Sequence, residues 1–356
     1  MTAFFSGVGV VLSLELRQRV RGTAWYVLLA VFVALLALVT VLLSYAFTGF
    51  GSMGQGVAGG GIYSTIIYFV LLLGTLVAPA LSGNAINGDR DAGTLATTQV
   101  TLVTTGQIVI GKFLASWITA LAFLAASVPF LIYASLVGGL TGTTVAVSLV
   151  ILAVELGVVA AIGVGLSGIL SRPLFSIVLT YLMVAALSVG TLIAFGLGGL
   201  ASQSGQTVTN TYSETYTEDG EPIDCSQTDT YTTTIPRFDR FWGVLVANPY
   251  VLLADAVPTQ LGTSGYPEDL FGQIKLAVRT AQLEPDLNQV FNSCEVAETG
   301  VDPNAGPLPQ EVIDTTVPGW FVGLLAHLIL AAAALIGAWA RTRTPIGRLS
   351  KGSRIA

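Results

Sequence analysis

The stretch TTVAVSLVILAVELGVVAAIGVGLSGIL, residues 143–170, decides the fold class, because it contains a single charged side chain, Glu155. A hydrocarbon core of about 30 Å needs roughly 20 predominantly apolar residues in a helix. Five further stretches pass the same test: 24–47, 62–83, 107–137, 174–199 and 318–340. The sequence therefore predicts an all-α polytopic membrane protein with six transmembrane helices.

The composition supports a membrane protein and argues against several other classes. Of the 356 residues, 53% are hydrophobic and 10% are charged, whereas soluble domains carry about 25% charged residues. The net charge of −6 comes from residues 200–317, which hold 17 of the 21 acidic side chains. We expect no nucleic-acid partner, and a single histidine with no C-x-x-C pair predicts neither a metal site nor an enzyme.

Residues 1–22 are predicted to form an amphipathic helix on the membrane surface. Apolar residues such as Phe4 and Phe5 come first, followed by Glu15, Arg17, Arg19 and Arg21. Arginines of such a helix would face anionic headgroups. The alternative is a frayed start to the first span. The segment lacks the basic start and the cleavage site of a secretory signal.

The distribution of basic residues predicts the orientation. Eleven of the 15 Lys and Arg residues precede span one, lie between spans two and three or four and five, or follow span six. Because such residues stay in the cytoplasm, both termini are expected there, with a basic tail at 342–356. The predicted units are residues 1–22, spans one to five at 23–199, an extracellular domain at 200–317 and span six at 318–341.

Residues 200–317 are predicted to form a mixed α/β domain outside the cell membrane. Alternating Thr and Tyr residues around Asp219-Gly220 favour a β-hairpin or edge strands. Helical patterns follow at 239–256, expected to rest against the outer leaflet, and at 268–282. Both cysteines, Cys225 and Cys294, lie here, and an oxidising exterior favours a disulfide between them over two buried thiols.

Two glycine motifs match nucleotide-binding patterns, but their context argues against that function. Residues 106–113 fit G-x-x-x-x-G-K, yet Phe113 stands where Mg²⁺ coordination needs Ser or Thr. Residues 163–168 fit G-x-G-x-x-G inside span four, with no preceding soluble strand. We expect the first to lead into a membrane helix and the second to be a small-residue helix-packing face.

The segment between spans two and three carries the most informative motif. Asp89, Arg90 and Asp91 form a charged cluster, and the chain from Thr94 onward is predicted to form a short helix across the membrane face. Such a projection suits docking of a cytosolic protein, and the alternative is an ordinary solvated loop.

The run Asp-Arg-Asp-Ala-Gly-Thr-Leu, followed by Gly111-Lys112 at the start of span three, resembles the signature of ABC-2 type export permeases. The Glu15-Leu16-Arg17 helix is similar to the elbow helix of that family, and Asn248-Pro249 resembles its external re-entrant region. The departures are Asp at 89 and 91, where Glu is commoner, and an unusually long external insert. The resemblance gives an elbow role to Glu15, Arg17 and Arg21 and an ATPase-coupling role, within 84–106, to Asp89, Arg90, Asp91, Gly93, Thr94 and Leu95.

The resemblance also implies partners. They are two separate ATP-binding subunits that carry ATP and Mg²⁺, a second permease copy or a homologous permease, and membrane lipid. No cofactor is expected in this chain itself. As the transmembrane subunit of an ABC exporter, the chain would provide the translocation path, and the ATPase would be a separate subunit.

Two ionisable residues, Glu155 in span four and His327 in span six, are predicted at similar depths in the membrane. Buried ionisable groups are costly and are candidates for function. Glu155 could accept a hydrogen bond from His327, line a cationic translocation path, anchor a dimer interface, or be satisfied by hydroxyl groups. Rival functions are an ion-coupled secondary transporter with this pair as a proton relay, and a receptor or assembly protein that uses the external domain.

Overall fold

The computed structural model describes residues 2–49, 55–93, 103–138, 140–213, 225–299 and 306–343. It is mostly helical, with one small sheet. Within the described ranges, six segments are long and apolar enough to cross a membrane: Thr23–Ala46, Gly60–Asp91, Thr105–Gly138, Gly142–Ile169, Pro173–Ala201 and Trp320–Thr342. They coincide with the six predicted spans, which confirms the helical, multi-pass fold class.

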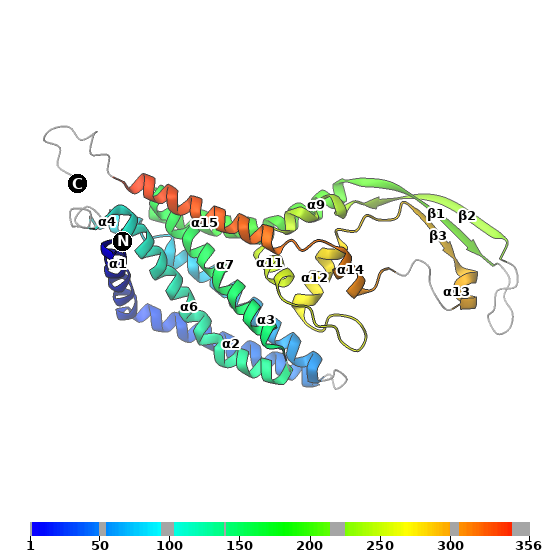
Figure 1. The fold of residues 1–356 in the computed structure, drawn as a ribbon, viewed down its shortest axis with the longest axis horizontal. Coiled ribbons are helices and arrows are strands. Elements are labelled where there is room, and N and C mark those ends of the chain that lie inside the picture. Colours follow the sequence, from blue (N-terminus) through cyan, green and yellow to red (C-terminus); the bar gives the residue numbers. More distant parts are fainter. Residues whose placement is uncertain are drawn as a thin grey trace.

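The helices form a bundle, and a sheet projects from one end of it (Figure 1). The bundle comprises α1 (Thr2–Arg21), α2 (Thr23–Gly49), α3 (Gln55–Ser82), α4 (Asn87–Asp91), α6 (Thr105–Gly138), α7 (Gly142–Ile169), α8 (Pro173–Ala185), the π-helical turn η1 (Ala186–Gly190), α9 (Thr191–Ala201) and α15 (Trp320–Thr342). Helix α1 and α4 lie at the end of the bundle opposite the sheet (Figure 1). We call the other end the sheet-side end.

Helix α7 packs against α3, α6 and α15, because small residues let its neighbours approach closely. A Cβ atom at Gly163 would overlap the Ser82 side chain, and one at Gly168 would lie 2.5 Å from the Cβ of Ala338. The G-x-G-x-x-G run is therefore a helix-packing face, as predicted. Residues 106–113 likewise lie in the first turns of α6 and form no phosphate-binding loop.

Beyond the bundle, the chain forms η2 (Phe238–Arg240), α10 (Trp242–Leu245), α11 (Pro249–Ala256), α12 (Leu270–Thr280) and α14 (Pro309–Thr315). The predicted helix at 268–282 corresponds to α12. The predicted continuous helix at 239–256 is wrong, because Pro249 has no N–H and starts a new helix. The Oδ1 atom of Asn248 accepts hydrogen bonds from the N–H groups of Tyr250 and Val251 and caps that helix.

Helix α11 also lies elsewhere than predicted. It packs against α12, α15 and α7 instead of resting on a lipid surface. Leu252 and Leu253 are fully buried in the same apolar core as Tyr63, Phe123 and Leu152 of the spans. The segment thus inserts into the sheet-side end of the bundle, because its apolar side chains gain more burial between helices than at a surface.

The sheet has the strand order β2-β1-β3 and comprises β1 (Gln203–Tyr212), β2 (Gln227–Pro236) and β3 (Asn288–Asn292). Strands β1 and β2 are antiparallel, with Thr207 opposite Thr232. This confirms the predicted strand pair, although Asp219-Gly220 falls outside the described residues. The third strand, β3, runs parallel to β1 with Val290 opposite Thr209, and the sequence analysis did not predict it.

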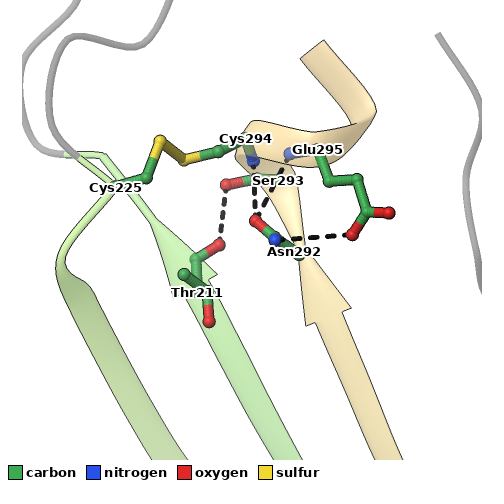
Figure 2. The surroundings of a disulfide bond; sticks show 6 residues. All are labelled: Thr211, Cys225, Asn292, Ser293, Cys294 and Glu295. Atoms are coloured by element: carbon green, nitrogen blue, oxygen red, sulfur yellow. Dashed lines mark hydrogen bonds between the residues drawn. A yellow bond between two sulfur atoms is a disulfide. The ribbon is translucent and has the colours of Figure 1, made fainter. Parts of the chain in front are cut away.

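A disulfide joins Cys225, just before β2, to Cys294 in α13 (Ser293–Thr299), as predicted. Figure 2 shows the adjoining hydrogen bonds. The Ser293 hydroxyl donates to the carbonyl oxygen of Thr211 at 3.0 Å, and Asn292 Oδ1 accepts from the N–H groups of Cys294 and Glu295. These contacts hold all three strands together at the tip of the sheet.

Candidate functional site

Lys112 connects three helices at the end of the bundle opposite the sheet. Its side chain is 3% exposed, and its ammonium group pairs with Glu15 of α1 and, at 2.7 Å, with Oδ2 of Asp89 in α4. We call Glu15, Asp89 and Lys112 the Lys112 cluster. Removing one partner of a buried ion pair typically costs about 3–5 kcal/mol. The cluster therefore fixes α4 and α1 to span three.

Arg90 fixes α4 to span four. Its NH1 group donates to Asn87 Oδ1 at 3.0 Å and to the carbonyl oxygen of Leu170 at 2.9 Å, at the C-terminal end of α7. A cation at this end also interacts favourably with the helix dipole. In return, Ser167 of α7 accepts hydrogen bonds from the backbone N–H groups of Ile86 and Asn87, both at 3.0 Å.

The predicted coupling residues thus have different surroundings. Asp89 and Arg90 bond within the protein, whereas Asp91, Ala92 and Gly93 are exposed. Gly93, two residues after the end of α4, has a φ of +70°, a conformation that favours glycine. Thr94 and Leu95 lie outside the described residues. The sequence did not indicate that two of the three charged residues would bond within the protein, because their partners, Lys112 on α6 and Leu170 at the end of α7, lie further along the chain.

The predicted elbow residues also fall into two groups, exposed residues and residues bonded within the protein. Arg17 and Arg21 are exposed, and Glu15 belongs to the Lys112 cluster. Arg19 was expected to face headgroups, but it points into the bundle and donates to the hydroxyls of Ser116 and Thr119 on α6, at 3.0 and 3.2 Å. Burial lowers the pKa of the Arg19 guanidinium, and Glu15 opposes this shift. Two side chains of α1 therefore bind α6.

Glu155 and His327 face each other inside the bundle, which was one of the predicted alternatives. Nδ1 of His327 lies 2.9 Å from Oε2 of Glu155, and both side chains are 2% exposed. Nε2 lies 3.0 Å from the carbonyl oxygen of Ala247, an acceptor, so Nε2 must be the donor. If Nε2 carries one proton and a second proton lies between Nδ1 and the carboxyl group, the pair has no net charge. We call Glu155 and His327 the buried dyad.

Through Ala247, the buried dyad contacts the segment 242–256, which contains α10 and α11 and which we call the α10–α11 segment. The next residue, Asn248, donates from its side-chain amide to the carbonyl oxygen of Ser188 at 2.6 Å and to the Thr191 hydroxyl at 2.9 Å. Ser188 lies in the π-helical turn η1, where α-helical hydrogen bonding is interrupted. The segment is thus bonded to spans five and six at adjacent residues.

A second buried ion pair, which the sequence analysis missed, secures the start of span six. Arg279 Nε donates to Asp255 Oδ1 at 2.8 Å. The other oxygen of Asp255 accepts hydrogen bonds from the N–H groups of Gly319 and Trp320, at 2.7 and 2.9 Å. A carboxylate is stabilising at a helix N-terminus. Asp255 therefore links α11, α12 and α15, and no local motif signals this arrangement.

The six long apolar helices give the described chain a membrane-type, multi-pass helical fold with a small sheet at one end of the bundle. In comparisons with protein-family models and with curated proteins, no family model and no curated protein matches this sequence. Its function must therefore be argued from the residues themselves. Within the described residues no group of three His, Cys, Asp or Glu side chains could hold a metal ion.

Proposed function

We propose that this chain is the transmembrane permease subunit of an ATP-driven ABC exporter of the ABC-2 type. The observation that supports this most strongly is the anchoring of α4. This short helix carries the Asp-Arg-Asp part of the family-like motif, and Asp89 and Arg90 bond it to spans three and four. A force applied to α4 from outside would be transmitted to both spans and, through Glu15, to α1.

In this proposal, the complex contains two separate ATP-binding subunits, which dock on the segment 84–105 and the N-terminal helix of the permease chains. Asp91 to Gly93 are the exposed residues of that segment within the described part of the chain. ATP and Mg²⁺ bind to those subunits, and a second permease copy or a homologous permease completes the translocation path. Helix α1 lies on the membrane surface with Arg17 and Arg21 toward lipid headgroups. The chain lies in the cell membrane. Both of its termini are in the cytoplasm, and residues 200–317 are extracellular.

The test is co-isolation of an ATPase from native membranes under gentle extraction. Asp91→Arg reverses a charge that is exposed and lies outside the Lys112 cluster, so the fold should persist while the partner is lost. Asp314→Arg, an equally exposed exchange on α14, is the matched control and should retain the partner. Failure to recover any ATPase, or full recovery with Asp91→Arg, would contradict the proposal.

A second candidate, an ion-coupled secondary transporter, is favoured by the contact within the buried dyad. A carboxyl group and an imidazole that share one proton could pass protons along a path. Proton uptake by ATP-free vesicles containing the purified chain, abolished by Glu155→Gln, would favour this candidate. Uptake that is absent in the wild-type protein would remove it.

A further inference from the structure

Span five consists of two halves that pack against different parts of the protein. On the side of the π-helical turn η1 that faces away from the sheet, α8 packs against α3 and α7. On the other side, α9 packs against α10, η2 and β2. Within the described residues, α9 makes at most isolated contacts with α3, α6, α7 and α15. The boundary between the two sets of neighbours therefore falls at η1.

Helix α9 is firmly attached to the sheet and to η2. Only Ser202 separates α9 from β1 (Figure 1). The backbone N–H of Arg237 donates to the carbonyl oxygens of Gly199 and Ser202, at 3.1 and 2.8 Å. A Cβ atom at Gly199 would overlap the ring of Phe238, so the helix and this ring are in close contact. We call α9, η2, α10 and the three-stranded sheet the outer unit.

The backbone of η1 is suited to bending. The N–H of Thr191 donates to the carbonyl oxygen of Ala186, five residues earlier, so the α-helical ladder is interrupted here. None of the residues Ala186–Gly190 is buried, and no packed side chain of this turn has to be displaced when it bends. Sharp kinks in helices concentrate at such turns. A change of direction therefore costs less at η1 than in the regular helix on either side.

Asn248 holds this turn in its present geometry. It lies between α10 and α11, where the chain returns from the outer unit to the bundle. Its side-chain amide donates to the carbonyl oxygen of Ser188 in η1 and to the hydroxyl of Thr191, while its Oδ1 atom caps α11. Both donors and both lone pairs of the amide are thereby used. Two of the chain connections between the outer unit and the bundle thus meet at one residue.

The apolar contacts around η1 leave room for rotation. Phe195, about one helical turn beyond Thr191, packs in a buried cluster with residues of α10, α11 and α12. Further along α9, Phe238 of the outer unit and Ala277 of α12 line an open hollow of about 330 Å³. A contact close to a pivot is displaced little by rotation, and the hollow separates surfaces that have few contacts to lose.

We propose that η1 is a hinge about which the outer unit swings relative to the bundle, and that the side-chain amide of Asn248 locks this hinge. When its two hydrogen bonds to span five break, the outer unit rotates while α8 stays packed on α3 and α7. Hinges absorb the backbone change over a few residues, and the flanking elements move as units. Ala247, the neighbour of Asn248, is bonded to His327, so a movement of span six reaches the lock directly. The inference does not depend on an ATPase partner.

The experiment measures distances between two spin labels by pulsed electron paramagnetic resonance, with the full chain in phosphatidylcholine nanodiscs. The labels are attached to non-natural amino acids, because cysteine labels would interfere with the Cys225–Cys294 disulfide. The hinge-spanning pair is Thr232 on β2 and Gln273 on α12, which are both exposed. The reference pair is Gln273 and the exposed Ser171. It lies on elements outside the outer unit and should keep one distance in every variant.

Asn248→Ser is the unlocking variant, because serine also caps a helix but is too short to reach Ser188 and Thr191. Losing two hydrogen bonds should raise the ratio of rotated to locked molecules about thirtyfold, which broadens or splits the distance distribution of the hinge-spanning pair. Thr191→Val removes one of the two bonds and should raise the ratio about fivefold. Thr180→Val is the matched control, because this hydroxyl bonds within α8, and it should leave the distribution unchanged.

Hydrogen exchange in β1 is measured on the same samples and should keep its wild-type rate, because the outer unit moves without unfolding. Three results would overturn the proposal. One is an unchanged hinge-spanning distribution in Asn248→Ser. Another is equal broadening in the reference pair or in Thr180→Val, which would indicate general loosening. The third is faster exchange in β1, which would indicate local unfolding in place of rotation. Because no ATPase is present, these results are independent of the exporter proposal.

Discussion

Oε2 of Glu155 in α7 lies 2.9 Å from Nδ1 of His327 in α15, although the two residues are 172 positions apart along the chain. The second ring nitrogen of His327 bonds to the carbonyl oxygen of Ala247, so the pair joins two spans and the α10–α11 segment. A buried pair of this kind is stable when both members are satisfied and costly when one is removed.

We predict that Glu155→Gln is tolerated and that His327→Leu is not. Glutamine can donate its amide hydrogen to Nδ1 of neutral His327, so the loss of stability should be about 1 kcal/mol. Leucine leaves a buried carboxyl group without its partner and should cost about 3 kcal/mol. Thermal unfolding of the detergent-purified variants measures both. The double variant Glu155→Gln/His327→Leu should recover part of the loss, and equal losses in the two single variants would contradict the assignment.

Lys112→Met should loosen the end of the bundle opposite the sheet. The substitution leaves Glu15 and Asp89 close together without the cation that neutralises them. The loss should be smaller than the about 3–5 kcal/mol of a fully buried pair, because the Asp89 side chain is 35% exposed. Hydrogen exchange should accelerate in α1 and α4 more than in α15. Arg17→Met removes an exposed cation from the same region and should leave exchange unchanged. Uniform acceleration over all spans would argue against a local anchoring role.

Acid should loosen the base of the sheet, where Arg237 holds Asp239. The hydrogen bond from Arg237 lowers the pKa of Asp239 below its ordinary value of 3.8. A depressed folded-state pKa stabilises the fold above 3.8, and this contribution is lost as the pH falls through the folded-state pKa. Proteolysis at the junction of span five and the sheet should therefore increase as the pH falls below about 4.

Asp239→Asn should abolish most of this acid sensitivity, because the titrating group is gone. Glu284→Gln is the matched control, since Glu284 contacts the same arginine but its side chain is 73% exposed. Exposed ion pairs contribute little, so this variant should keep the wild-type pH profile. Identical profiles for the wild type and Asp239→Asn would show that another group controls the transition.

Reduction of the Cys225–Cys294 disulfide should affect the sheet and spare the spans. The bond closes a loop with a sequence separation of 69, for which chain entropy gives about 4 kcal/mol. The double variant Cys225→Ser/Cys294→Ser should make the tip of the sheet protease-sensitive while the helical content persists. A loss of the whole helical signal would contradict this separation. Wild-type protein treated with a reductant should behave as the double variant does.

The six spans could be predicted because they depend on local apolar length. The disulfide could be predicted because the chain has only two cysteines. An apolar stretch such as 143–170 has one low-energy solution in a bilayer, and two cysteines in one segment allow one intramolecular bond. The β1–β2 pairing was equally accessible from alternating residues. The interruption of the predicted helix 239–256 at Asn248-Pro249 was not predicted, although proline commonly starts a new helix. The apolar pattern continues across this position and favoured a single helix.

The sequence predicted individual residues of the candidate site but not most of their ion-pair partners. The sequence singled out Asp89, Arg90, Glu155 and His327 by their charge in unusual positions. It did not assign Lys112 to Glu15 and Asp89, or Asp255 to Arg279, because ion-pair partners are chosen by proximity in the folded bundle. Strand β3 was missed because its five residues gain their stability from pairing with β1.

The sequence by itself determined that this chain has six helices long and apolar enough to cross a membrane, because that property depends on length and composition alone. Tertiary structure decided which charged side chains bond within the protein, how the α10–α11 segment packs against the bundle, and that Glu155 meets His327. These relationships depend on distances between residues far apart in the chain, and only close packing of the helices fixes those distances.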